Sequence, residues 1–324
     1  MGKTNDKSLE LSEKLLKEKS AALFCHVRPD GDTIGSACAL KLALKSKGVN
    51  ATVFCTDAVP EKYRFLSEAN NIVNEYSGVF GEFSALVAID NAEITRLGDF
   101  AEAFTKHKNT YSIDHHSSNT RYAKINYIDA KSSNAENVFA LIREMKAEIT
   151  PEIANLLALG IMTDTGGFRH KNVSARTFYD AAKLVSCGAD MHELYFHAFT
   201  RQSKERAKLF GKTMTDIRYF KEGRIAVASV LLKDFKSTGA KQEETEGFID
   251  FVMGVDGVEV GACVMETETN KFKISLRSNG TDVNAVAAEF GGGGHRLASG
   301  CKITGEYEEV IDRLVVAISK YLAD

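Results

Sequence analysis

The feature that most constrains the fold of this chain is a regular alternation of short apolar segments and helical segments. Four segments are short and rich in β-branched or aromatic residues, as strands are, and they cover residues 21–27, 51–56, 84–89 and 110–113. Helices are predicted between them at 33–47, 61–67 and 100–106. Strands separated by helices form parallel sheets with helices on both faces. We therefore expect an α/β fold with a doubly wound, mainly parallel sheet.

The rest of the chain predicts a second domain of a different kind. The length of 324 residues exceeds the ~100–200 residues of one domain. Two β-hairpins are predicted at 217–231 and 258–277, followed by a helix at 283–290, a strand at 298–303 and a closing helix at 307–322. We expect an N-terminal domain over 1–202, a polar linker helix over 203–215 and a smaller mixed α+β domain over 216–324.

Composition and charge limit the classes of protein to which this chain can belong. No apolar run approaches the ~18 residues that span a bilayer, and the charged N-terminus lacks the apolar core of a signal peptide. The formal net charge is −3 and the pI is near 6.3, which favours a small anionic ligand over a long nucleic acid. Six scattered cysteines without a CxxC pair are expected to be buried apolar side chains in a reducing compartment. We therefore expect a cytoplasmic protein with no membrane partner.

Acidic residues and histidines lie at or after the ends of predicted strands, or at the end of a further helix that is predicted over 151–162 after a Thr150 N-cap. They lie in four separate segments: His26, Asp30 and Asp32; Asp90; Asp114, His115 and His116; and Asp164. The carboxyl ends of parallel strands meet at one edge of a sheet, so the first three sets should lie together. Crowded carboxylates resist joint ionisation, and divalent cations remove that penalty. Mixed carboxylate and imidazole ligands suit Mn²⁺, Fe²⁺, Co²⁺ or Zn²⁺ better than Ca²⁺.

Each of these residues also has a purely structural explanation. Asp30 and Asp32 could belong to a simple turn, because Pro-Asp-Gly is a favoured turn sequence. Asp90 could be a helix N-cap, and Asp164 could cap a glycine turn. The two consecutive histidines could lie on the surface. The conjunction of all four segments with a topology that brings them to one edge favours a metal site.

The sequences around these residues resemble a known family. HVRPDGDTIGS, AID, DHH and TDTGGF are similar to the four motifs of the DHH phosphoesterase superfamily. The later segments SLRSNG and FGGGGHRLASG are similar to the glycine-rich signature of the accessory C-terminal domain of that family. The resemblance covers nearly the whole chain. The order and spacing of the motifs most resemble the branch of nanoRNases and pAp phosphatases, where pAp is 3′-phosphoadenosine 5′-phosphate.

The resemblance implies two divalent metal ions, with Mn²⁺ as the expected metal. One ion would be held by His26, Asp30 and Asp90, and the other by Asp32, Asp90, His115 and Asp164, so that Asp90 bridges them. Two ions about 3.5–4 Å apart would activate a shared water as hydroxide for in-line attack on phosphorus. Of the remaining motif residues, His116 would donate to the phosphate or shuttle a proton, and Asp114 would orient an imidazole.

For the C-terminal domain the resemblance implies substrate binding, with the active site in the cleft between the domains. The residues expected to bind substrate are Arg277, Ser278, Gly292, Gly293, Gly294 and His295. Consecutive glycines let the backbone approach a ligand, and their amides can form an anion-binding nest. Arginine suits bidentate recognition of phosphate. A glycine run alone can equally be a flexible loop, so this interpretation depends on the arginine and the histidine beside it.

The expected activity is metal-dependent hydrolysis of short oligoribonucleotides, called nanoRNA, and of pAp. A cyclic-dinucleotide phosphodiesterase is an alternative within the same family. A non-catalytic nucleotide-binding protein that keeps the fold is another alternative, although all six candidate metal ligands are present. A homodimer is compatible with the sequence, but no apolar pattern specifies one.

Overall fold

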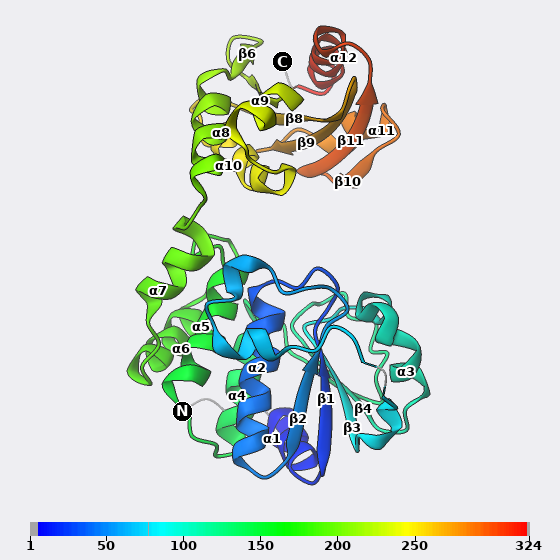
Figure 1. The fold of residues 1–324 in the computed structure, drawn as a ribbon, viewed down its shortest axis with the longest axis vertical. Coiled ribbons are helices and arrows are strands. Elements are labelled where there is room, and N and C mark those ends of the chain that lie inside the picture. Colours follow the sequence, from blue (N-terminus) through cyan, green and yellow to red (C-terminus); the bar gives the residue numbers. More distant parts are fainter. Residues whose placement is uncertain (1–5, 77, 323–324) are drawn as a thin grey trace. The chain divides into compact units, whose positions relative to one another are not determined.

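The computed structural model describes residues 6–76 and 78–322, and the chain divides into two compact units between Arg201 and Gln202 (Figure 1). The helix predicted over 203–215 is α8 (Lys204–Thr215), which belongs to the second unit and packs against α9 (Leu232–Thr238). The boundaries at 202 and 216, and the cleft between the domains as the place of the active site, stay predictions.

The first unit is built on a five-stranded parallel sheet in the order β2-β1-β3-β4-β5. The strands are β1 (Ser20–Phe24), β2 (Asn50–Phe54), β3 (Ala85–Ile89), β4 (Thr110–Asp114) and β5 (Ile125–Ile128). Four of them lie where the sequence predicts strands, and the parallel sheet is confirmed. β5 was not predicted, because its four residues are too few to show a sustained apolar pattern, and only Tyr127 among them is buried.

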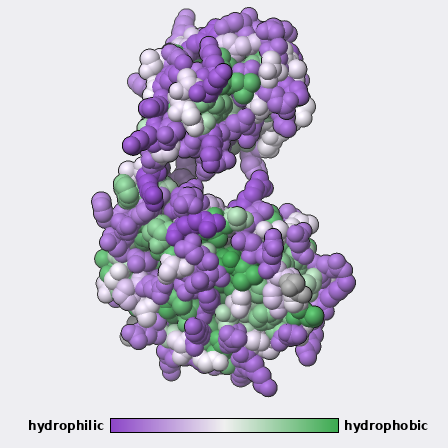
Figure 2. Space-filling model, viewed as in Figure 1, coloured by the Kyte–Doolittle hydropathy of each residue, from purple (hydrophilic) through white to green (hydrophobic). Residues whose placement is uncertain are grey.

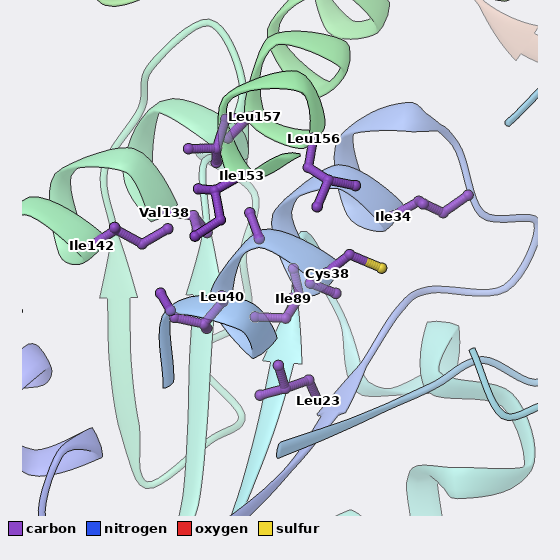
Figure 3. Packing of buried hydrophobic residues seen from close by; sticks show 14 of the residues in the cluster. Leu23, Ile34, Cys38, Leu40, Ile89, Val138, Ile142, Ile153, Leu156 and Leu157 are labelled. Atoms are coloured by element: carbon purple, nitrogen blue, oxygen red, sulfur yellow. The ribbon is translucent and has the colours of Figure 1, made fainter. Parts of the chain in front are cut away.

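Helices cover both faces of this sheet (Figure 1). The α-helices are α1 (Asp6–Leu15), α2 (Gly31–Ser46), α3 (Ala101–Lys106), α4 (Asn134–Glu144), α5 (Pro151–Asp164), α6 (Ala175–Ser186) and α7 (Met191–Tyr195). One face packs on α2, α4 and α5 through side chains such as Leu23, Leu40 and Leu157 (Figure 3). The other face carries an aromatic cluster that includes Phe24 and Phe104. Leu23 and Phe24 are consecutive, so strand alternation sends them to opposite faces.

Short helical turns complete the described elements. They are η1 (Glu61–Tyr63), η2 (Ser67–Asn71), η3 (Phe80–Glu82), η4 (Ile94–Phe100), η5 (Phe196–Thr200) and η6 (Gln242–Thr245). The prediction of one helix over 61–67 is wrong, because this segment contains the 3₁₀ turn η1 and only the start of η2. A segment of that length is too short to form a stable α-helix without extensive packing, and 3₁₀ turns are its usual form.

The second unit contains a six-stranded mixed sheet in the order β10-β11-β9-β8-β7-β6. The strands are β6 (Arg218–Phe220), β7 (Ile225–Val230), β8 (Val260–Glu268), β9 (Lys271–Ser278), β10 (Gly293–His295) and β11 (Ala298–Thr304). The remaining helices are α10 (Phe248–Met253), α11 (Val283–Ala288) and α12 (Tyr307–Ser319). Only β7 and β8 pair in parallel. The two predicted hairpins are β6–β7 and β8–β9, and the mixed α+β architecture is confirmed.

Each of the two units has its own apolar core. Hydrophilic side chains cover most of the face drawn in Figure 2, with smaller apolar patches between them. Within the described ranges, no helix combines the length and the apolar character needed to cross a membrane. The six cysteines form no disulfide, and all except Cys187 are buried, as the sequence predicted.

Candidate metal centre

The loop after β1 and the first turn of α2 hold three of the predicted metal ligands. His26 and Asp32 are 2% and 0% exposed. Asp30 is the N-cap of α2 and uses Oδ1 to accept backbone N–H groups of that helix, while its Oδ2 lies 3.5 Å from Nε2 of His26. Asp32 accepts two N–H groups at the start of α4, at 2.6 and 2.8 Å. The local turn therefore occupies only one oxygen of Asp30 and leaves the other facing the imidazole.

Asp90 follows β3 in a left-handed backbone conformation, with a φ of 57° that residues other than glycine rarely adopt. It caps no helix, because the N-cap of the next turn is Glu93. Its carboxylate lies between two imidazoles, with Oδ2 3.6 Å from Nε2 of His26 and Oδ1 3.4 Å from Nε2 of His115. Oδ1 is buried and accepts no hydrogen bond in the described part of the chain. Backbone strain and an unsatisfied buried oxygen are both typical of functional sites.

The DHH triplet fixes two imidazoles at the end of β4. Asp114 is fully buried, and its Oδ1 lies 2.7 Å from Nδ1 of His116. Nδ1 of His115 lies 3.1 Å from the carbonyl oxygen of Lys131, which places the proton on Nδ1. Nε2 of His115 is thus left facing Asp90 and, at 3.2 Å, Asp164. His116 is held through one nitrogen and keeps its Nε2 available.

Asp164 closes α5, and two glycines bring this helix to the site. Between α2 and α5, a Cβ added to Gly35 would lie 2.1 Å from the carbonyl oxygen of Leu156. A Cβ on Gly160 would lie 2.7 Å from Oδ1 of Asp32. Only glycine permits this approach. The close packing of the two helices places the C-terminal end of α5 beside the N-terminal turn of α2.

The structure brings all six predicted metal ligands to one edge of the sheet. Their donor atoms form groups within which all atoms lie within 4.8 Å of one another: His26, Asp30 and Asp90; Asp32, His115 and Asp164; and Asp90 and His115 together with Asp114 and His116. The first two groups come from separate segments of the chain and contain three donors each. The assignment of each residue as a ligand stays a prediction.

Electrostatics at this edge favours added positive charge. Burial raises the pKa of Asp164 to about 7, and the nearby charge of Asp90 adds to the shift. Burial also holds the pKa of Asp32 well above its usual range, with further repulsion from the neighbouring carboxylates. Burial lowers the pKa of His26, but Asp30 and Asp90 outweigh it and raise the value to about 9. Without cations the cluster retains protons, and carboxylate and imidazole donors at this spacing fit divalent metal ions.

Two polar residues at this edge were not predicted from the sequence. Nδ2 of Asn119 donates to Oδ2 of Asp114 at 2.7 Å and to the carbonyl oxygen of Asn91 at 3.0 Å. A guanidinium nitrogen of Arg96 lies 3.0 Å from Nδ1 of His26. Both residues lie outside the strands and α-helices, so no periodic pattern marks either of them in the sequence. Asn119 completes the set of partners that orient Asp114, and through it His116.

In the second unit, Arg277 of β9 and His295 of β10 lie on the same face of the sheet. Ala298 of β11 pairs with both of them, so the three residues form one row across the strands. Residues directly opposite one another point to the same side, and two strand spacings place Arg277 and His295 about 10 Å apart. His295 is exposed, and the Arg277 guanidinium donates to the carbonyl of Leu276 without an ion pair among the described residues. This row is suited to binding an anion.

The other predicted substrate residues have structural roles of their own. The glycine run was not predicted to contain a strand, but Gly293 and Gly294 belong to β10 and pair with β11. A Cβ on Gly292 would lie 2.3 Å from the carbonyl oxygen of Gly300, so close strand packing requires glycine there. The Ser278 hydroxyl is 2.5 Å from the Thr281 carbonyl oxygen, to which it donates. Binding of substrate by these residues stays a prediction.

Comparisons with known proteins agree with this architecture. The family described as DHH family, N-terminal domain, matches residues 20–161, and the DHHA1 domain matches residues 222–324. The bifunctional oligoribonuclease and PAP phosphatase NrnA of Thermus thermophilus is 31% identical over 97% of this chain and 94% of its own length. A probable bifunctional oligoribonuclease and PAP phosphatase NrnA of Streptococcus mutans is 30% identical over 85% of this chain and 86% of its own length.

A solved structure extends the similarity through both units. The crystal structure of an exopolyphosphatase-related protein from Bacteroides fragilis matches with a TM-score of 0.87 and 26% identity. The match covers 99% of this chain and 98% of that one. The fold, the matched domains and the relatives together show that the chain belongs to the DHH family of phosphoesterases, in its NrnA-like branch with a C-terminal DHHA1 domain.

Proposed function

We propose that this protein is a metal-dependent phosphoesterase that hydrolyses short oligoribonucleotides and pAp. The observation that carries the proposal is the position of the Asp90 carboxylate between His26 of its own three-donor group and His115 of the other three-donor group. The names of the NrnA relatives support the substrate class. The acidic total charge is consistent with substrates of one to a few nucleotides rather than long nucleic acids.

Two divalent ions, with Mn²⁺ as the expected metal, suit the predicted ligands. His26, Asp30 and Asp90 would hold one ion, and Asp32, Asp90, His115 and Asp164 would hold the other. When bound, such ions polarise the phosphate and lower the pKa of a bound water. The hydrogen bonds of the two histidines support the proposal. Nδ1 of His115 faces a backbone carbonyl at 3.1 Å, and Nδ1 of His26 faces the Val27 carbonyl at 2.9 Å. A proton on Nδ1 leaves the lone pair of each imidazole on Nε2, the nitrogen that would bind metal.

His116 would act on the reacting phosphate without binding metal. In the hydrolysis, a water oxygen forms a bond to phosphorus, the ester P–O bond breaks and the leaving oxygen gains a proton. Asp114 accepts the Nδ1 proton of His116, raises the pKa of the imidazole and orients it. Nε2 could then donate a hydrogen bond to a phosphate oxygen or a proton to the leaving group. Asp114 would therefore support catalysis by positioning His116.

The second unit would bind the part of the substrate that does not react. Arg277 and His295 share one face of the sheet and suit a phosphate group, because arginine makes paired hydrogen bonds to its oxygens. Gly292, Gly293, Gly294 and Ser278 would shape the backbone around the ligand. Both pAp and a dinucleotide carry a nucleoside and phosphate besides the bond that is cut, so a second binding surface would favour small nucleotides over simple phosphate esters.

We further propose that the protein acts in the cytoplasm, with no membrane partner, and that a homodimer is compatible with this activity. Two alternatives differ in their readouts. A cyclic-dinucleotide phosphodiesterase would turn over the cyclic substrate faster than the linear dinucleotide. A non-catalytic binding protein would bind pAp at saturating Mn²⁺ without releasing phosphate.

The test is hydrolysis by the purified protein with Mn²⁺, using a diribonucleotide, pAp, a cyclic dinucleotide and a long RNA side by side. Asp90→Asn is the sharpest variant, because asparagine tolerates the left-handed backbone and keeps the volume while losing the charge. We expect release of mononucleotides from the short substrates and a loss of at least about 100-fold in the variant. Its metal-free form should unfold at the same temperature or higher, because one repelling carboxylate is gone.

A matched control is Asp99→Ala, which removes an exposed aspartate of the same unit and should leave turnover unchanged. Unchanged turnover in Asp90→Asn would contradict the metal assignment. Faster cleavage of the cyclic substrate, or binding without hydrolysis, would replace the proposed function with one of the two alternatives.

A further inference from the structure

An arginine without a carboxylate partner lies directly against the candidate metal centre. Arg96 belongs to η4, the turn after the Asp90 loop, and its guanidinium nitrogen Nη2 is 3.0 Å from Nδ1 of His26. Within the described residues it makes no ion pair, although four carboxylates of the predicted ligand set lie at this edge of the sheet. A half-buried guanidinium left unpaired beside an acidic cluster is unusual, because buried or partly buried charges are normally paired.

The backbone of Arg96 is fixed to the loop that carries His26. Its carbonyl oxygen accepts the N–H of Val27 at 2.8 Å. The next carbonyl, of Leu97, accepts the Thr56 hydroxyl at 3.2 Å, and the Leu97 side chain is fully buried. The backbone of Arg96 is therefore held in place, while its side chain can still change its hydrogen-bond partner. A residue with a fixed backbone and a long side chain that forms no ion pair is suited to binding a ligand.

The hydrogen bonding of His26 decides whether that guanidinium has an acceptor on the imidazole. Nδ1 has two neighbours, the Val27 carbonyl oxygen at 2.9 Å and Arg96 at 3.0 Å. Arg96 can donate to Nδ1 only while Nδ1 carries a lone pair. An imidazole that binds a metal through Nε2 carries its proton on Nδ1, and that proton is accepted by the carbonyl. When His26 ligates a metal through Nε2, Nδ1 is therefore no acceptor for Arg96, and the N–H donors of Arg96 are left for another group.

We infer that Arg96 binds the phosphate of the substrate at the metal centre, through non-bridging oxygens whose charge grows during hydrolysis. The inference rests on the proposed function and adds a residue to it from the first unit. Phosphate matches the geometry of a guanidinium, which donates two parallel hydrogen bonds. In the described ranges, no other arginine or lysine side chain forms a hydrogen bond or ion pair with a predicted metal ligand. Arg96 donates hydrogen bonds only and transfers no proton.

The experiment compares Arg96→Ala and Arg96→Lys with the unchanged protein. The matched control is Arg143→Ala, an exposed arginine in the last turn of α4, the end opposite the one that meets Asp32. Three quantities are measured for each: Mn²⁺ affinity by calorimetry, affinity of the Mn²⁺-loaded protein for inorganic phosphate, and kcat and KM for a diribonucleotide. Guanidinium chloride at low concentration is added to the alanine variant to replace the missing group.

We expect Arg96→Ala to lower kcat by about 10²- to 10³-fold, the cost of removing one donor to a developing negative charge. Phosphate affinity should fall by about 10- to 100-fold, as expected for a lost charged hydrogen bond. Mn²⁺ affinity should stay unchanged, guanidinium should restore part of the rate, and Arg96→Lys should retain more activity than the alanine variant. Arg143→Ala should match the unchanged protein in every measurement.

Two results would overturn the inference and leave the proposed function intact. One is hydrolysis by Arg96→Ala at the normal kcat with normal phosphate affinity. The other is loss of Mn²⁺ binding in both Arg96 variants, which would make Arg96 a structural support of His26. If Arg96→Ala does not fold, the lysine variant decides, because it keeps the charge and the alkyl chain. An unchanged protein that binds Mn²⁺ but neither binds phosphate nor cleaves any substrate would overturn the proposed function itself.

Discussion

The candidate residues of the two units are held in opposite ways. In the first unit, Asp32, Asp90 and Asp114 are at most 2% exposed, and backbone groups or neighbouring imidazoles surround their carboxylates. In the second unit, His295 is exposed, and the Arg277 guanidinium donates a hydrogen bond to a backbone carbonyl. Catalytic groups need fixed positions, whereas a long side chain can capture a phosphate that arrives in several orientations. We therefore expect substitutions of the candidate residues in the first unit to lower kcat, and those in the second unit to raise KM.

The largest expected effect tests the first half of this comparison. His116→Ala removes the imidazole that Asp114 orients, while the predicted metal ligands remain. We expect kcat for the diribonucleotide to fall by about 10²- to 10⁴-fold, the usual contribution of a general acid or base, with little change in KM. Initial rates at saturating Mn²⁺ measure both. The control is His192→Ala, an exposed histidine of α7, and a rise in KM alone in His116→Ala would place His116 with the binding residues.

A substitution with an intermediate expected effect tests the expectation for the second unit. Arg277→Ala should raise KM for pAp and the diribonucleotide by about 10- to 100-fold, because one charged hydrogen bond to phosphate is lost. The value of kcat should change little, since the residue lies outside the first unit. Arg313→Ala, on α12 in the same unit, is the control and should leave KM unchanged. A fall in kcat with unchanged KM would break the division of roles between the two units.

The same contrast explains how much the sequence alone could predict. In the first unit, the order of strands and helices determines which loops share an edge, so the acids after β1, β3 and β4 could be grouped without any distances. The partners that orient them could not, because Asn119 and Arg96 lie in turns whose conformation no periodic pattern describes. The short edge strand β5 was missed for the same reason, since pairing with β4 rather than its own sequence makes it a strand.

In the second unit, the sequence indicated the right residues but not the shape of the glycine run. Glycine is depleted in strands, so four consecutive glycines predict a loop. Pairing of Gly293 and Gly294 with β11 nevertheless makes part of the run a strand, because hydrogen bonds between backbones need no side chain. Glycine is required at position 292 because the backbone of Gly300 approaches it. The two residues are close in sequence, but this approach arises only when the hairpin folds.

The smallest expected effect separates packing from binding within this glycine run. A Cβ on Gly292 would lie 2.3 Å from a backbone oxygen of β11, whereas a Cβ on Gly293 would meet its nearest atom at 3.7 Å. Gly292→Ala should therefore destabilise the β10–β11 pairing by about 1–3 kcal/mol, and Gly293→Ala by less than about 0.5 kcal/mol. Hydrogen–deuterium exchange of β10 and β11 in the full chain measures the difference directly. If the backbone at Gly293 approaches a ligand, its alanine variant should keep normal exchange but raise KM, because a methyl group then occupies the space of the substrate. Normal exchange together with a normal KM would show that the run serves the hairpin alone, and phosphate binding in this unit would then depend on Arg277 and His295.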